Sequence, residues 1–177
     1  MKKLIIGAPV GGLILFIWQF LSYSTFDLHY NQMSYTPDQE EVMTYLESKM
    51  TQGEYYMIRA PKGDMEEQSR LMEARLGKPW AMIQYHEAME NTFFTNLIRA
   101  FIVNSLAIGF LCWIMMQMAD LTMKNAIITS ILVGLIGYLT INYIDGVWFQ
   151  IGTIPDLIDA IVPWAATGAW LGFWLKK

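Results

Sequence analysis

Five polar residues stand within or beside long apolar stretches, and they are the first candidates for chemistry: Arg99, Asn104, Asp145, Asp156 and Asp159. Ionisable side chains are costly in hydrocarbon, so they usually bind one another, an ion or a proton there. Counted at about 1.5 Å per helical residue, all five fall in one layer. One interpretation is a structural clamp in which Arg99 pairs with Asp159 or Asp156. The other is a vestibule for protons or small cations.

Metal and catalytic chemistry find little support in the sequence. The two histidines, His29 and His86, are weak candidates for a metal site, because no ligand spacing joins them. The single cysteine, Cys112, excludes an intramolecular disulfide. No Gly-rich phosphate loop, nucleophile elbow or HExxH motif is present. We therefore expect no catalytic residue, no bound metal, no cofactor and no enzymatic activity.

The apolar stretches predict the elements that position the polar layer. The sequence is 54% hydrophobic and 16% charged, which is too apolar for an ordinary soluble domain. A helix of about twenty residues crosses a ~30 Å hydrocarbon core. Four stretches have this length: residues 4–21, 97–118, 126–144 and 154–175.

The expected fold class is an α-helical polytopic membrane protein with four transmembrane helices. A small α+β extracytoplasmic domain is inserted between helices 1 and 2. The chain then divides into an N-terminal signal-anchor helix, the inserted domain and a three-helix region, at residues 1–22, 23–96 and 97–177.

Lysines next to the spans predict the orientation. Lys2 and Lys3 precede the first apolar stretch, and no small-x-small cleavage site follows it, which favours an uncleaved signal anchor with a cytoplasmic N-terminus. Threading the four spans then places residues 23–96 outside the cytosol and the C-terminal Lys176-Lys177 inside.

The inserted domain has the pattern of a small mixed fold. A capped start at Thr36-Pro37 opens a helix that ends before Gly53, and a second helix ends at Gly77. Strands are expected at residues 54–59 and 80–86, with residues 28–35 as a third. Such a domain closes only a thin core, so its apolar side chains are expected to pack on the membrane helices or on a partner.

Small residues recur at the four-residue spacing that lets helix backbones approach. The pairs are Gly7 with Gly11, Ser130 with Gly134, and Gly168 with Gly172. We expect these faces to pack inside one bundle. Homodimerisation through one of them is the alternative.

The acidic residues are concentrated in the inserted domain. Twelve of the sixteen lie between Asp27 and Glu90, and the net charge is −4. This charge argues against nucleic acid and anionic lipid headgroups as partners of the domain. The expected partners are the lipids around the spans and other envelope proteins.

A run of residues in the first third of the chain resembles a family of small bacterial inner-membrane proteins. The run is Gly11-Gly12-x-Ile14-Leu15-Phe16-Ile17-Trp18, Ser22, Leu28-His29, Glu40-Glu41-Val42, Leu46 and Gly53-Glu54-Tyr55-Tyr56. Members of that family usually carry a proline after the aromatic pair, where this chain has Met57 to Pro61. The resemblance implies a bacterial inner-membrane location with a periplasmic inserted domain, and it implies no activity.

Two functional hypotheses follow. The leading one is a non-enzymatic accessory or assembly subunit of a larger envelope complex, because catalytic constellations are absent and helix-packing motifs are frequent. The alternative is a component of a proton or small-cation transporter or channel that works through the polar layer. The stretch between that layer and the opposite helix ends lacks ionisable residues, which disfavours transport by this chain alone.

The predicted orientation can be tested with a reporter enzyme that folds only outside the cytosol. Fused near Glu66, it is expected to be active, and fused after the C-terminal lysines it is expected to be silent. Activity of the second fusion but not the first would reverse the predicted topology.

Overall fold

The structure, a computed structural model, describes residues 2–176. It is mostly helical and divides into two compact units. The helical unit comprises Met1–Ser34 and Thr92–Lys177, and the inserted unit comprises Tyr35–Asn91. The helical unit thus includes ten residues beyond the first helix, because residues 25–34 fold back onto it.

The helical unit contains four long helical segments. They are α1 (Lys2–Ser24), α4 (Phe93–Met116), the run of α5 (Met123–Gly137), η2 (Tyr138–Asn142) and α6 (Tyr143–Phe149), and α7 (Ile154–Leu175). The element η2 is a π-helical turn, which widens the helix locally and is frequent at functional sites.

Three of these segments are long and apolar enough to cross a membrane: Lys2–Ser24, Phe93–Met116 and Met123–Phe149. This is the character of an integral membrane protein, as the sequence predicts. α7 has 22 residues but is not among the three. Its two aspartates, Asp156 and Asp159, and its two prolines lower its mean hydropathy, so the fourth span stays a prediction.

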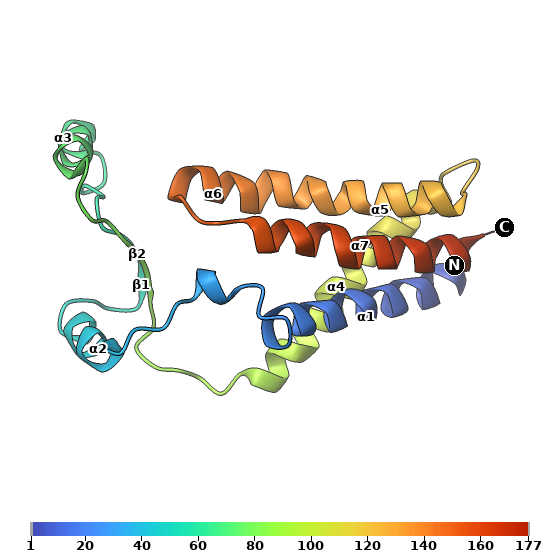
Figure 1. The fold of residues 1–177 in the computed structure, drawn as a ribbon, viewed down its shortest axis with the longest axis horizontal. Coiled ribbons are helices and arrows are strands. Elements are labelled where there is room, and N and C mark those ends of the chain that lie inside the picture. Colours follow the sequence, from blue (N-terminus) through green and yellow to red (C-terminus); the bar gives the residue numbers. More distant parts are fainter. Residues whose placement is uncertain (1, 177) are drawn as a thin grey trace. The chain divides into compact units, whose positions relative to one another are not determined.

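The first and last helices of the chain are neighbours in space. α1 lies against both α4 and α7, and α7 lies against both α1 and α5 (Figure 1). α4 and α5 follow one another in the chain but contact each other little. The order across the helical unit is therefore α4, α1, α7 and α5.

Glycines bring these helices into close contact. A Cβ atom at Gly12 would lie 2.7 Å from the backbone of Ser105 on α4. A Cβ atom at Gly134 would lie 2.3 Å from the carbonyl oxygen of Ala160 on α7. The other glycines of the predicted packing motifs also face neighbouring helices of the same chain: Gly7, Gly11, Gly168 and Gly172. These contacts account for the small residues within a single bundle.

The helical unit has an apolar core with a few buried polar side chains, and it exposes many large apolar ones. Ile108, Leu111 and Leu171 are buried in the core. Ser22, Ser130 and Thr167 are also buried, whereas Phe110, Trp113 and many other large apolar side chains are exposed. Such an exposed apolar surface is unfavourable in water, but in hydrocarbon it faces lipid.

The inserted unit contains two helices and a two-stranded antiparallel sheet. The helices are α2 (Gln39–Glu47) and α3 (Met65–Arg75), and the strands are β1 (Gly53–Tyr56) and β2 (Met82–Tyr85). The Asp64 carboxylate accepts a hydrogen bond from the Glu67 amide and begins α3. Arg70 donates two hydrogen bonds to Glu67, which lowers the pKa of that carboxyl.

The prediction of a third strand at residues 28–35 is wrong. That segment contains a single 3-10 turn, η1 (Tyr30–Gln32), and the described sheet has only β1 and β2. The alternating apolar residues that suggested a strand instead follow the end of α1, where the side chains of His29 and Gln32 bind α7.

Two glycines on α5 allow a matched test of the helix packing. Gly134→Ala places a methyl group against the backbone of α7, and we expect it to lower the free energy of unfolding by about 1–3 kcal/mol. Gly137→Ala lies less than one turn away, where nothing is within 4 Å of the new atom. It is expected to be neutral or stabilising by up to about 1 kcal/mol. Thermal unfolding in detergent compares the two, and equal effects would contradict this packing.

Candidate functional site

Asp159 is the centre of a polar cluster between α1 and α7. Its Oδ1 atom accepts hydrogen bonds from Trp18 Nε1 and Ser22 Oγ, each at 2.8 Å. Its Oδ2 atom lies 3.0 Å from His29 Nε2. An ionised carboxylate can accept all three bonds, because it has about four lone-pair positions and no donor.

The chain brings these three partners together by simple local geometry. Trp18 and Ser22 are four residues apart on α1, so they lie on the same face of that helix. Asp27 adopts a left-handed conformation with φ of 50°, and the amide of Leu28 donates to the carbonyl of Ser22. The chain therefore turns back at the end of α1 and returns His29 to α7. We call residues 25–34 the strap.

The side chains of His29 and Gln32 make further contacts that hold the strap. The ring of His29, only 2% exposed, stacks on Tyr23 with centroids 3.9 Å apart. Gln32 Nε2 donates to the Asp156 carboxylate at 2.9 Å and to the carbonyl of Gly152 at 2.7 Å. Asn142, the last residue of the π-helical turn, donates to the other Asp156 oxygen at 2.9 Å. Both aspartates of α7 thus fasten other segments to this helix.

We call this set of side chains the polar clamp. Its members are Trp18, Ser22, His29, Gln32, Asn142, Asp156 and Asp159.

A cavity of about 500 Å³ borders the polar clamp. All four long helical segments contribute to its lining. The polar lining residues are Trp18, Gln19, Tyr23, Asn104, Tyr138, Asn142, Asp156 and Asp159. Gln19 and Asn104 are hydrogen-bonded to each other in this lining, and the Asn104 amide donates to the Gln19 carbonyl oxygen at 2.8 Å. Such a cavity can hold water or a small polar ligand between the helices.

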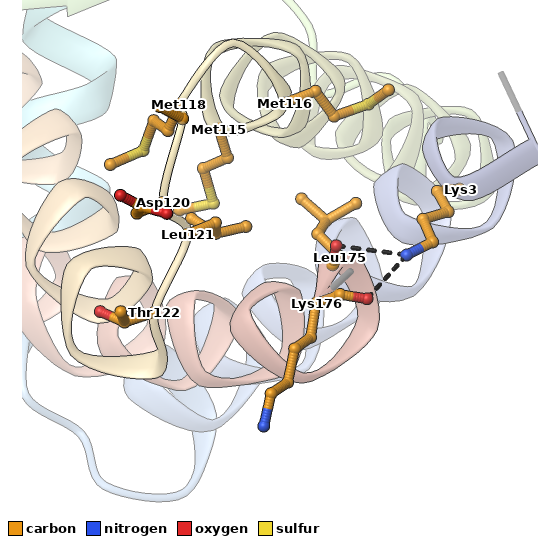
Figure 2. Close-up of a pocket in the computed structure, with 10 residues that line it drawn as sticks. Lys3, Met115, Met116, Met118, Asp120, Leu121, Thr122, Leu175 and Lys176 are labelled. Atoms are coloured by element: carbon orange, nitrogen blue, oxygen red, sulfur yellow. Dashed lines mark hydrogen bonds between the residues drawn. The ribbon is translucent and has the colours of Figure 1, made fainter.

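A second cavity, of about 490 Å³, lies at the opposite end of the helical unit. Figure 2 shows the Lys3 ammonium reaching the last carbonyls of α7, with bonds of 3.2 Å to Leu175 and 2.8 Å to Lys176. Three methionines and several other apolar side chains line the cavity, which makes it chemically different from the first. Lys3 caps the C-terminus of α7 and stabilises its dipole.

The predicted polar layer divides in the structure. Asp156, Asp159 and Asn104 come together at the first cavity, as their common depth indicates. The expected pairing of Arg99 with Asp159 or Asp156 is wrong, because the only ion pair that either aspartate makes among the described residues is with His29. Arg99 and Asp145 are exposed and lie outside the lining of this cavity.

Sequence reasoning missed the partners of Asp159. Trp18 and Ser22 were residues of the family-like run and His29 a weak metal candidate, yet the three together form the donors to one carboxylate. The sequence did contain a signal for these three residues, namely two polar groups four residues apart on an apolar helix, followed by a histidine. Gln32 carried no signal, because its role depends on the turn at Asp27.

The clamp contains a serine, a histidine and an aspartate but not the geometry of a nucleophilic triad. In a triad the histidine bonds the serine hydroxyl, whereas here Ser22 and His29 both bond Asp159. Among residues 2–176 there is no group of three His, Cys, Asp or Glu side chains that could hold a metal ion. His86 lies apart, exposed in the inserted unit after β2.

Comparison of the chain with protein-family models, with curated proteins and with solved structures found no match. The resemblance to small bacterial inner-membrane proteins therefore stays a prediction, and function has to be argued from the site and the two units.

Two aspartates at the same end of the helical unit allow a test of the polar clamp. Asp159→Ala leaves Trp18, Ser22 and His29 without their acceptor, at about 1–3 kcal/mol for each buried group that stays unpaired. We expect a loss of at least about 2 kcal/mol in unfolding free energy. Asp145→Ala, at an exposed position, is expected to change it by less than about 0.5 kcal/mol. Denaturant titration in mixed micelles measures the unfolding free energy of both variants. An Asp159→Ala variant as stable as the unsubstituted protein would contradict the stabilising role of the polar clamp.

Proposed function

We propose that the protein is a non-enzymatic integral membrane protein that acts as a small accessory or assembly subunit of a larger envelope complex. One observation carries the proposal. The inserted unit of 57 residues buries only two apolar side chains, those of Ala60 and Tyr85. A domain with so little buried surface is marginal alone and gains stability when a partner covers it.

The exposed apolar side chains of the inserted unit fit this role. Neither α2 nor α3 contains a buried residue. Val42 and Met43 on α2 and Met72 on α3 are each about half exposed, and Leu76 is 78% exposed. Methionine-rich surfaces adapt to a partner's shape, because the thioether chain is flexible and polarisable. The proposed occupant is another protein of the same complex, and a second copy of this chain is the alternative.

The proposed topology has four spans, with α7 as the fourth. α7 has 22 residues, against 23, 24 and 27 for the other spans, and it packs between α1 and α5, where its aspartates find donors from the same chain. The inserted unit lies outside the cytosol of a bacterial cell, both termini lie inside, and lipid surrounds the exposed apolar faces. The acidic inserted unit disfavours nucleic acid as a partner.

A second candidate function rests on the cavity beside the polar clamp. Asp156 and Asp159 line it without a lysine or arginine partner, which favours a proton or small cation. Along α4, however, the fully buried Ile108 and Leu111 separate this cavity from the one at the Lys3 end. This apolar layer interrupts the path that conduction by one chain would need.

The leading proposal is tested by site-specific photocross-linking in cells, with the full chain. A cross-linking amino acid at Met43 or Met72 is expected to capture one and the same protein, which also stays bound after extraction in mild detergent. The matched control is the same amino acid at Lys62, in the exposed turn after β1. Recovery of an uncross-linked monomer from all three positions would contradict the subunit role.

A further inference from the structure

The orientation of the Gln32 side-chain amide determines the hydrogen bonding of His29. Gln32 Nε2 faces two acceptors, the Gly152 carbonyl and the Asp156 carboxylate. Reversing the amide would place its oxygen against both, so the nitrogen must face them. The amide oxygen of Gln32 then faces His29 Nδ1, and this oxygen can only accept.

Both ring nitrogens of His29 therefore face acceptors. Nδ1 faces the Gln32 amide oxygen, and Nε2 faces the Asp159 carboxylate at 3.0 Å. A neutral imidazole has one N–H group and can satisfy only one of them, whereas an imidazolium has two and satisfies both. With His29 only 2% exposed, water does not readily replace the missing bond.

We propose that His29, Gln32 and Asp159 form a site that binds one proton and thereby fastens the strap to α7. The proton resides on the His29 ring, and both of its N–H groups donate. The positive imidazolium then compensates the Asp159 carboxylate beside the cavity. This site is separate from the apolar surface of the inserted unit, on which the subunit role rests.

The proposed site has a defined response to pH. Histidine is the side chain that changes charge between about pH 5 and pH 8. The titratable groups around the ring are Asp159 and Tyr23 in contact and Asp156 behind Gln32. When the ring loses its proton as pH rises, one of its two hydrogen bonds is lost. The strap loosens on the alkaline side, and two uncompensated carboxylates then border the cavity.

The test combines two measurements on the full chain in detergent. Nitrogen NMR of the histidine rings is expected to show both nitrogens of His29 protonated while the strap is held. A spin label attached through Asn31→Cys, at an exposed strap position, reports how firmly the strap is held. Loss of one charge-assisted hydrogen bond corresponds to about a tenfold increase in the loosened fraction. The label should therefore become more mobile as pH rises and the ring loses its proton.

Variants of the two histidines complete the experiment. His29→Gln is expected to abolish the pH response of the label, and His86→Gln, in the inserted unit, is expected to leave it intact. A neutral His29 ring in a single tautomer, observed while the strap is held, would overturn the proposal. A spin label whose mobility does not change with pH would also overturn it, and so would a pH response that disappears in the His86→Gln variant. The ring spectrum is read on the unsubstituted histidine, so it decides even where the His29 variant fails to fold.

Discussion

The carboxylate of Asp159 is the interaction on which the rest of the helical unit depends. It binds two side chains of the first helix and one of the strap, and it sits on the last helix. At the other end, Lys3 and Trp174 join the same two helices, through bonds to Lys176 and Lys3 carbonyls at 2.8 Å each. α1 and α7 are therefore held together at both ends, and α4 packs mainly on α1 while α5 packs mainly on α7.

Hydrocarbon around the helices explains why glycine, serine, threonine and amide side chains accompany the apolar core of the helical unit. Between spans in lipid there is little gain from burying another leucine, so association depends on close backbone approach and on polar groups that need partners. The contact between Gly134 and α7 provides the first, and the Ser130 hydroxyl, which donates to the Trp164 carbonyl at 2.5 Å, provides the second.

The sequence predicted the positions of the long helices well, but it predicted the side-chain contacts between them poorly. Apolar runs placed the long helices within a few residues, because helix length in a bilayer is set by a simple thickness. The sequence also predicted that Asp156, Asp159 and Asn104 lie at a common depth. Arg99 was expected to pair with Asp159 or Asp156 because opposite charges attract, but depth alone does not say which face of α4 a residue occupies. The turn at Asp27, which returns His29 to α7, depends on one backbone angle that no periodicity reveals.

The pairing of the first helix with the last has a consequence for biosynthesis. α7 leaves the ribosome after the other described elements, and until then Trp18, Ser22 and His29 lack the Asp159 carboxylate as an acceptor. In the proposed four-span topology, α7 is also the segment least able to enter a bilayer unaided, since it carries two aspartates. α1 and the strap thus supply hydrogen-bond donors for Asp159, and Asp159 supplies the acceptor for them. A nascent chain released before Asp159 would leave Trp18, Ser22 and His29 without this carboxylate as an acceptor.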